Sequence, residues 1–354
     1  CVNSKLMINC ENNNLNKYNE KIQVQLTNPP IEAKNNEIVY GTICIDSNNA
    51  LDAFCAGKST DGLSWDTAHV ISDYDIDAEG YSRHAIVIQN TDRYLIIRDC
   101  EIKNAEIGLY FEDVSNVKII DNTISKNDNG IFLRDCNDNE ILENDINEND
   151  LFGIVLHDCN DNEISENTIK ENDDGGIYLK DCSDNEISEN TIKENGREGI
   201  YLDFDSNENE ISENTVQKNG LNGGIHLRDS NLNTILGNTI ENNEGHGIYL
   251  HKSKKKCDRN LISENVLNEN KNYGIYLRMS NHNKVLKNIL NYNKIGIVEE
   301  DCQGNTFKDN ICTPDDQVMM ISIIIFLIVI PSILGILIVY IVYIKKNYSS
   351  RSEK

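Results

Sequence analysis

The chain is poor in basic residues relative to acidic ones, and it has little methionine or tryptophan. Its 354 residues include 33 lysines and arginines against 58 aspartates and glutamates, for a net charge of −25. This acidity argues against nucleic-acid binding and predicts an exposed, well-solvated surface. The only Asn-x-Ser/Thr acceptor is Asn347-Tyr348-Ser349, so no N-glycan is expected on the rest of the chain. Apolar residues in the central region do not recur with a helical period, which excludes amphipathic helices there.

What the sequence does contain is a regular series of glycines, each followed by a short apolar segment. The steps between successive glycines are 22, 23, 23, 23, 25, 23, 27 and 22 residues. The nine positions are Gly108, Gly130, Gly153, Gly176, Gly199, Gly224, Gly247, Gly274 and Gly296. A fixed period of this size predicts stacked structural units.

The repeat at residues 162–179 shows what one unit forms. Its apolar residues are Ile164, Ile169, Ile177 and Leu179, which fall in short separated groups. The alternation at residues 177–180 predicts a half-buried strand. A unit of this length accommodates three strands with tight corners, and stacked units rise about 4.8 Å per coil. We therefore predict an all-β, right-handed, single-stranded parallel β-helix of about ten coils, roughly 50 Å long.

Three asparagine columns accompany the glycines at the same period. Asn167, Asn162 and Asn172 represent them in one repeat. Asparagine tolerates the left-handed backbone of tight corners, and stacked side-chain amides can hydrogen-bond from coil to coil. We interpret these columns as scaffold.

The repeat pattern N-x-I-x-x-N-x-I-x-x-N-x-x-x-G-I-x-L and the segment at residues 90–100 resemble NosD-type and CASH-type (carbohydrate-binding and sugar hydrolysis) β-helix repeats. The resemblance covers about residues 69–312. It implies the β-helix fold, and it leaves the function open among copper delivery, polysaccharide processing and surface roles.

The regions outside the repeats give the expected domain order. Residues 1–68 lack the repeat and are predicted to cap the β-helix, which occupies residues 69–312. Residues 313–317 form a short linker. Residues 318–344 carry no charge and are long enough to span a bilayer as one C-terminal transmembrane helix. The basic tail 345–354 is then cytoplasmic and the β-helix lies outside the cell membrane.

Two expectations concern the start of the chain and its cysteines. Because the chain begins with Cys1 and no export signal is present, we expect that a leader was removed or that the sequence is a fragment. Cys136, Cys159 and Cys182 form one column, with Asp205 and Ser253 at the corresponding position of later coils, and are predicted to be a ladder of small residues without disulfides. Cys44 and Cys55 are better disulfide candidates.

The strand after each glycine has an outward face with two columns of potential binding residues. The column two residues after the glycine is largely aromatic, and the next outward column is largely basic. The predicted ligand-binding residues are Phe132, Tyr178, Tyr201, Tyr249 and Tyr276, with Arg134, Lys180, Arg228 and Arg278. Aromatic faces can stack on sugar rings, and cations can bind hydroxyls or uronate carboxylates. The alternative is that these columns only stabilise an exposed strand.

Other chemistry would require a departure from the repeat. Asp203 and Asp205 are the catalytic candidates, because Asp203 interrupts the basic column and paired carboxylates can act on a glycosidic bond. His226 and His251 face the same side, but their Cβ atoms are expected to be roughly 8 Å apart. With only four methionines as additional soft ligands, we predict no metal or cofactor. The insertion at residues 252–259 is basic and could contact an anionic polymer or lipid headgroups.

Taken together, these observations favour a membrane-anchored surface protein that binds glycan or cell-envelope components without catalysis. A polysaccharide-processing enzyme of the same fold is the main alternative. A copper-handling protein and a structural spacer are the others.

Overall fold

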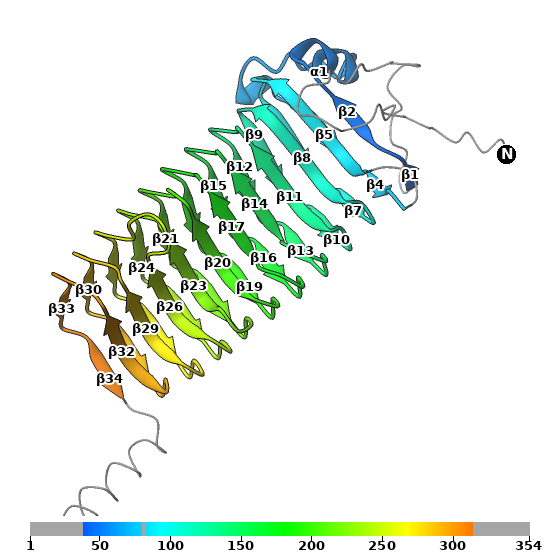
Figure 1. Ribbon diagram of the computed structural model, residues 1–354. Helices are drawn as coiled ribbons and strands as arrows, with labels where there is room; N and C mark the ends of the chain where they lie inside the picture. The colour runs from blue at the N-terminus through cyan, green and yellow to red at the C-terminus, as the bar shows by residue number, and fades with distance from the viewer. Residues whose placement is uncertain (1–37, 80–82, 314–354) are drawn as a thin grey trace, which may run out of the picture.

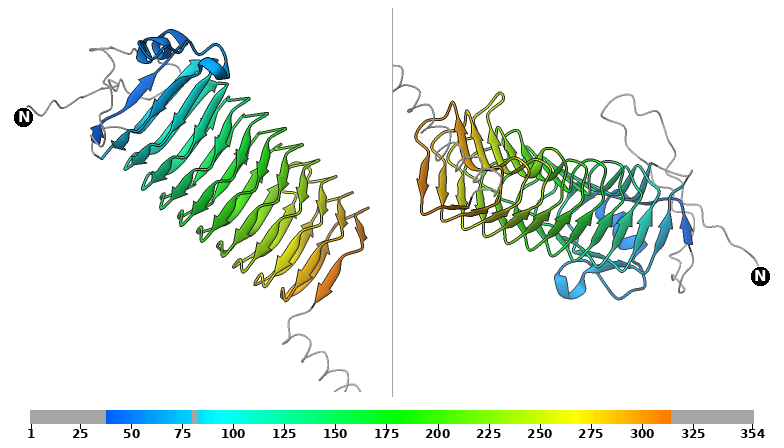
Figure 2. Two further views of the ribbon diagram at one scale, coloured as in Figure 1. Left: turned by 180° about the vertical axis from the view of Figure 1, so that it is seen from behind. Right: turned by 90° about the horizontal axis from the view of Figure 1, so that it is seen from below.

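The computed structural model describes residues 38–79 and 83–313, which wind into a parallel β-helix (Figure 1). The predicted all-β fold is therefore confirmed. Each coil contributes one short strand to each of three parallel sheets, in which a strand pairs with the strands three places before and after it in chain order. Two further views show the same elongated rod from behind and from below (Figure 2).

Sheets 1, 2 and 3 are defined by the order of their strands along the rod. Sheet 1 has twelve strands: β1 (Ile38–Tyr40), β4 (Asp75–Asp77), β7 (Glu101–Lys103), β10 (Thr123–Ser125), β13 (Asp145–Asn147), β16 (Thr168–Lys170), β19 (Thr191–Lys193), β22 (Thr215–Gln217), β25 (Thr239–Glu241), β28 (Val266–Asn268), β31 (Ile289–Asn291) and β34 (Ile311–Thr313). Sheet 2 has eleven: β2 (Ile43–Ile45), β5 (His84–Thr91), β8 (Ile107–Val114), β11 (Asn129–Arg134), β14 (Ile154–His157), β17 (Ile177–Lys180), β20 (Glu198–Asp203), β23 (Gly223–Arg228), β26 (His246–His251), β29 (Tyr273–Arg278) and β32 (Ile295–Glu300). Sheet 3 also has eleven: β3 (His69–Ser72), β6 (Leu95–Arg98), β9 (Val117–Ile120), β12 (Glu140–Leu142), β15 (Glu163–Ser165), β18 (Glu186–Ser188), β21 (Glu210–Ser212), β24 (Thr234–Leu236), β27 (Leu261–Ser263), β30 (Lys284–Leu286) and β33 (Thr306–Lys308).

The β-helix begins earlier than the glycine period indicates. Strands β1 and β2 lie within the segment predicted as a cap, yet they pair in register with β4 and β5. The same segment contains one short helix, α1 (Asn48–Phe54), and one 3₁₀ turn, η1 (Trp65–Thr67). Helix α1 begins at Ser47, whose side chain accepts a hydrogen bond from the Ala50 backbone N–H, and it buries Leu51 against the first coils.

The core consists of columns of aliphatic side chains that point inward from all three sheets. Ile169, Ile177 and Ile187 are fully buried, and each pairs in register with an isoleucine of the next coil. The burial alternation in β17 follows from the period-2 geometry of a strand, which sends Tyr178 and Lys180 to the outer surface.

The glycine column exists because neighbouring coils approach closely at this corner. A Cβ atom on Gly176 would lie 2.5 Å from the Gly199 carbonyl oxygen and 2.6 Å from Cγ2 of Ile192. No side chain fits in that space, so the regular spacing of the glycines follows from a steric requirement.

The predicted asparagine ladders are confirmed. The side-chain oxygen of Asn190 accepts hydrogen bonds from the backbone N–H and from Nδ2 of Asn167, each at 3.0 Å. Nδ2 of Asn190 in turn donates to Ile164 O at 2.8 Å and to Asn214 Oδ1 at 3.0 Å. The expected left-handed backbone, however, belongs to the residue before the ladder, such as Glu166 with φ 57°. The ladder asparagine points its side chain inward and stays out of that region.

The cysteine column is also a ladder, with two corrections. The backbone N–H groups of Cys136 and Cys159 donate to the sulfur of the next cysteine, at 3.4 and 3.3 Å, and all three cysteines are buried and free. Ser206 continues the column, where Asp205 was expected, because Cys182 N–H donates to Ser206 Oγ at 3.3 Å. Likewise Cys257 is buried while Ser253 is exposed, so the inserted residues displace Ser253.

The two cysteines expected to form disulfides differ from one another. Cys44 is disulfide-bonded. Cys55 is a free thiol, fully buried beside α1, so the prediction for Cys55 is wrong.

Within residues 38–79 and 83–313, no helix is long and apolar enough to cross a membrane. The transmembrane helix predicted at 318–344 and the tail at 345–354 lie outside the described residues.

Candidate functional site on the outer face of sheet 2

The outward side chains of sheet 2 form two parallel columns, as the sequence predicts. The first, called here the aromatic stripe, aligns Tyr178, Tyr201, His226, Tyr249 and Tyr276 in register on β17, β20, β23, β26 and β29. The second, called here the polar column, aligns Lys180, Asp203, Arg228, His251 and Arg278 on the same strands. Phe132 and Arg134 occupy the corresponding positions on β11, and Val155 separates Phe132 from Tyr178. All nine predicted binding residues therefore lie on one face.

The rings of the stripe stack on one another. Centroids of successive rings from Tyr178 to Tyr276 lie 4.8–5.1 Å apart, with interplanar angles of 6–21°. Stacking at the coil spacing covers the faces of the central rings, which leaves their edges and hydroxyl groups toward solvent. The faces of the central rings are therefore covered by neighbouring rings and are not available for the sugar stacking expected from the sequence.

The tyrosine hydroxyls are hydrogen-bond donors at neutral pH. Burial raises the pKa of Tyr178 and of Tyr201 above the usual value, and the nearby Asp203 carboxylate raises both further. Tyr178 Oη donates to Asp203 Oδ2 at 3.3 Å.

Asp203, the acidic residue within the polar column, binds the Arg228 guanidinium. Its carboxylate is 1% exposed and accepts hydrogen bonds from Nε and Nη2 of Arg228 and from the backbone N–H of Phe204. The Arg228 guanidinium also lies over the rings of Tyr201 and Phe204, 5.4 and 4.9 Å from their centroids. This arrangement fixes the position of Arg228 on the outer face.

Asp205, the second catalytic candidate, has a different partner from Asp203. It is half-buried and forms an ion pair with Lys255. Each carboxylate is thus bound to its own cation, which favours a charge-pairing role for both.

A third group was not predicted as a unit: Glu198, His226 and His251. His226 Nδ1 lies 3.2 Å from Glu198 Oε1, and His226 Nε2 lies 2.9 Å from His251 Nδ1. Asn222 Nδ2 donates to Glu198 Oε1 at 2.7 Å. The diagonal register of the two histidines agrees with the prediction. Their rings nevertheless turn toward each other, so that ring nitrogens come within hydrogen-bonding distance despite the wide spacing expected for the Cβ atoms.

The charge states of this cluster follow from its burial. Burial opposes ionisation of Glu198, but the hydrogen bond and the charge of His226 outweigh it and lower the pKa of Glu198. Burial, reinforced by His226 and Arg228, lowers the pKa of His251 to about 4. The cluster therefore has an ionised carboxylate at one end and a neutral imidazole at the other near pH 7.

The sequence carried a partial signal for this cluster. Glu198 precedes Gly199, where the two coils before it have Gly175 and Phe152. An acidic residue at a buried position of sheet 2 requires a partner, and a histidine on the next strand is the nearest candidate.

The basic insertion folds against the same face. Asp229 is fully buried, and its carboxylate accepts hydrogen bonds from the backbone N–H groups of Ser253 and Lys254 at 2.6 and 2.9 Å. Nζ of Lys254 lies 5.7 Å from the centroid of the Phe204 ring. The insertion at 252–259 and the extra residues after Asp203 are therefore in contact.

The described residues do not fit a copper ion. Their one His/Cys/Asp/Glu cluster with ligand atoms within 4.8 Å of one another is His157, Asp158 and Asp181. There the Lys180 ammonium lies 3.1 Å from His157 Nε2 and competes with a cation. The column cysteines are buried, and the facing nitrogens of His226 and His251 bind each other. Within the described part of the chain, no set of soft ligands converges on one point, as copper requires.

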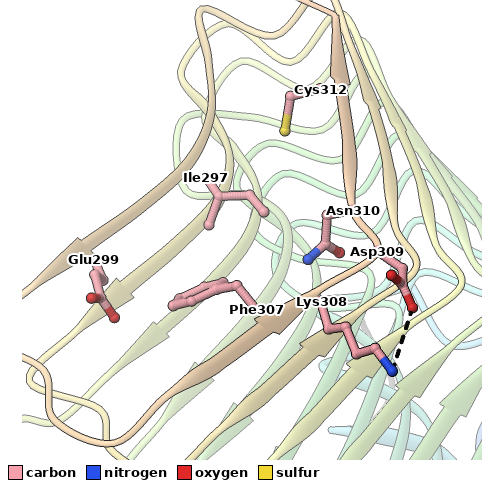
Figure 3. A pocket seen from close by; sticks show the side chains of 7 residues that line it. All are labelled: Ile297, Glu299, Phe307, Lys308, Asp309, Asn310 and Cys312. Carbon is pink, nitrogen blue, oxygen red and sulfur yellow. Dashed lines mark ion pairs between the residues drawn. The ribbon is translucent and has the colours of Figure 1, made fainter.

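A cavity of about 410 Å³ lies at the C-terminal end of the described rod (Figure 3). Ile297, Phe307 and Cys312 line it, and they align with the core residues Ile275, Val285 and Leu290 of the preceding coils. The cavity is thus the interior of the last described coil and is separate from the outer face of sheet 2.

Comparison with known proteins supports the β-helix fold. The profile of the family described as "Periplasmic copper-binding protein (NosD)" matches residues 62–239, and the one described as "Right handed beta helix region" matches residues 174–312. No curated protein sequence matches the chain significantly.

Solved structures share the fold at low identity. The Dettilon tailspike protein (gp208) is 16% identical with a TM-score of 0.59, covering 74% of this chain. This chain spans only 61% of the length of that tailspike. The Azotobacter vinelandii mannuronan C-5 epimerase AlgE4 A-module is 14% identical with a TM-score of 0.54, covering 76% of this chain and 75% of its own. The chain belongs to the NosD family of right-handed parallel β-helix repeat proteins.

Proposed function

We propose that this chain binds a polysaccharide along the outer face of sheet 2 without catalysing its cleavage. The observation that carries the proposal is the repetition of tyrosine hydroxyl edges on β17, β20, β26 and β29, beside cationic side chains on β17, β23 and β29. A polymer of repeating hydroxylated units presents acceptors and donors at regular intervals, so several weak contacts add along one chain. One protein of similar fold is a mannuronan C-5 epimerase, which is consistent with a polysaccharide partner.

The polar groups on this face are already oriented by the protein. Asp203 holds Arg228, and stacking holds the tyrosine rings, so little side-chain entropy is lost when a ligand binds. An otherwise acidic rod that concentrates fixed cations on one face is suited to a ligand that is neutral or acidic.

The test separates the hydroxyl groups from the stack that carries them. In the variant Tyr178→Phe/Tyr201→Phe/Tyr249→Phe, the rings still stack but lose their hydrogen-bonding groups. We expect retention in affinity electrophoresis on acidic and neutral polysaccharides to be lost, with an unchanged circular dichroism spectrum. Tyr292→Phe, at an exposed corner after β31, is the matched control. Equal retention of the triple variant and the wild type would contradict the proposal.

An enzymatic role is the second candidate, favoured by the Glu198–His226–His251 cluster beside Arg228. A carboxylate–imidazole pair can accept and return a proton, and an arginine can bind a uronate carboxylate. Polysaccharide incubated with the protein would then gain new reducing ends or unsaturated ends, and His251→Gln would abolish them. Retention without new ends would exclude this candidate for the polymers tested.

We further propose that residues 318–344 anchor the chain in the cell membrane as a single pass, with the β-helix outside and the C-terminus cytoplasmic. The uncharged run and the basic residues after it support this orientation. Protease added to intact cells should digest an epitope fused before residue 38 but not one fused after residue 354; the opposite result would overturn the orientation.

A further inference from the structure

Two departures from the repeat meet on the flank of the rod. The first is the extra pair Phe204–Asp205 after β20, in which both residues have left-handed backbones, with φ of 38° and 50°. The second is the loop between β26 and β27, which the buried Asp229 carboxylate holds through two backbone N–H groups. Phenylalanine rarely adopts a positive φ, so this conformation persists because the surrounding contacts hold it.

Together these residues form a basic knob, defined here as Phe204, Asp205, Arg228, Lys254 and Lys255. Two cations lie near the Phe204 ring, with the Arg228 guanidinium 4.9 Å and the Lys254 ammonium 5.7 Å from its centroid. Lys254 and Lys255 are exposed, and Lys255 pairs with Asp205. The knob thus places two cations beside one aromatic ring and a third, Lys255, on the adjacent Asp205, in a chain of net charge −25.

We propose that the basic knob is a subsite for the acidic group of a sugar, a carboxylate or a sulfate ester, and that Asp205 occupies the place of that group until the ligand binds. The inference rests on the proposed function, because the knob continues the polar column at Arg228. It names the substrate class as an acidic polysaccharide.

The Asp205–Lys255 pair is suited to such an exchange. Its side chains are 44% and 50% exposed, and an exposed ion pair of this kind contributes little to stability. A ligand carboxylate that replaces Asp205 gains Lys255 and the neighbouring Lys254 at small cost. Asp203, by contrast, is 1% exposed and keeps Arg228 in position throughout.

The position of the knob favours a polymer over a lipid surface. Its residues follow the ends of β20 and β26 and contact Arg228 of the polar column on β23, so a ligand along the stripe reaches the knob at the strand ends of sheet 2. A bilayer would contact the lysines and gain nothing from the stripe.

The experiment compares charge-matched variants of the full chain on named probes. The probes are polygalacturonate, dextran sulfate, neutral dextran, and phosphatidylcholine vesicles with one third phosphatidylserine. Lys254→Ser/Lys255→Ser should weaken binding to both acidic polymers by about tenfold and leave neutral dextran unchanged. Its control, Lys271→Ser/Lys287→Ser, removes two exposed lysines that pair with Glu244 and Glu264. The control should change the affinity for neither the acidic polymers nor neutral dextran.

Asp205→Asn gives the opposite and more specific result. It releases Lys255, so affinity for the acidic polymers should rise about threefold, and the gain should shrink in high salt. Glu244→Gln, with the same change in net charge, should have no effect. A response to polygalacturonate but not to dextran sulfate would identify the acidic group as a carboxylate, and the reverse would identify a sulfate ester.

The outcomes distinguish this inference from the proposed function. If acidic and neutral polymers bind alike and Asp205→Asn changes nothing, the subsite is wrong while polysaccharide binding stands. Vesicle binding that depends on Lys254 and Lys255, without polymer binding, would overturn it in favour of a membrane contact. If the wild type retains no polysaccharide, the proposed function itself fails.

Discussion

Removing one rung of an asparagine ladder should destabilise the whole rod. In Asn190→Ala, the backbone N–H of Asn167 loses its acceptor, and the Ile164 carbonyl loses a donor that lies 2.8 Å away in the native protein. Both groups are in the interior, where water cannot replace the lost partner. Each buried unsatisfied group costs about 1–3 kcal/mol, so we expect the free energy of unfolding to fall by about 2–6 kcal/mol.

The measurement is urea unfolding of the full chain followed by far-ultraviolet circular dichroism, with amide hydrogen exchange of Asn167 as a local readout. The matched control is Asn147→Ala, because the Asn147 side chain donates only to Asp145 Oδ1 at 3.0 Å and is partly exposed. The control should lose less than about 1 kcal/mol. If both variants lose the same stability, or if the hydrogen exchange of the Asn167 amide is unchanged, the ladder hydrogen bonds do not stabilise the fold as proposed.

Three further changes test other parts of the structure. Gly176→Ala places a Cβ 2.5 Å from Gly199 O, and thermal unfolding should show a loss of about 1–3 kcal/mol or failure to fold; a wild-type melting temperature would refute the steric argument. Burial, with the charge of a neighbouring arginine, lowers the pKa of His84 to about 4, so its neutral form stabilises the fold above the unfolded pKa of 6.5 and this contribution is lost as pH falls from 6.5 toward 4. Wild type should therefore lose about 2 kcal/mol more than His84→Phe between pH 7 and 5 in urea titrations, and parallel curves would contradict this. Asp203→Asn should lower stability by about 1–3 kcal/mol by leaving Arg228 unpaired, with part of the loss recovered in Asp203→Asn/Arg228→Gln; full additivity of the two changes would argue against the pair.

The fold could be predicted from the sequence because the same steric and hydrogen-bonding requirements recur from coil to coil. From Gly108 onward, each coil has a glycine where backbones meet, asparagines at its ladder positions and inward aliphatic side chains, and these residues recur at nearly the same interval. The outward columns follow from strand alternation, which is why Tyr178, Lys180 and Arg228 lie on the face expected for them.

The contacts within that face could not be predicted in the same way. The strand register gives the distance between His226 and His251 at Cβ, but their hydrogen bond depends on how both rings turn. The stacking of the tyrosine rings could not be predicted for the same reason. The register alone does not say whether a tyrosine presents the face or the edge of its ring. The contact between Phe204 and Lys254 joins two irregular segments that share no period. The sequence repeat specifies the backbone scaffold, whereas these contacts depend on the conformations of side chains that belong to different coils.

The central claim is that the outer face of sheet 2 holds a polysaccharide without cleaving it. The most direct test incubates the full chain and the Tyr178→Phe/Tyr201→Phe/Tyr249→Phe variant with a panel of acidic and neutral polysaccharides, and measures retention and new chain ends in the same samples. We expect retention by the wild type, loss of retention by the variant and no new ends with either. Equal retention by both proteins, or new ends generated by the wild type, would contradict it.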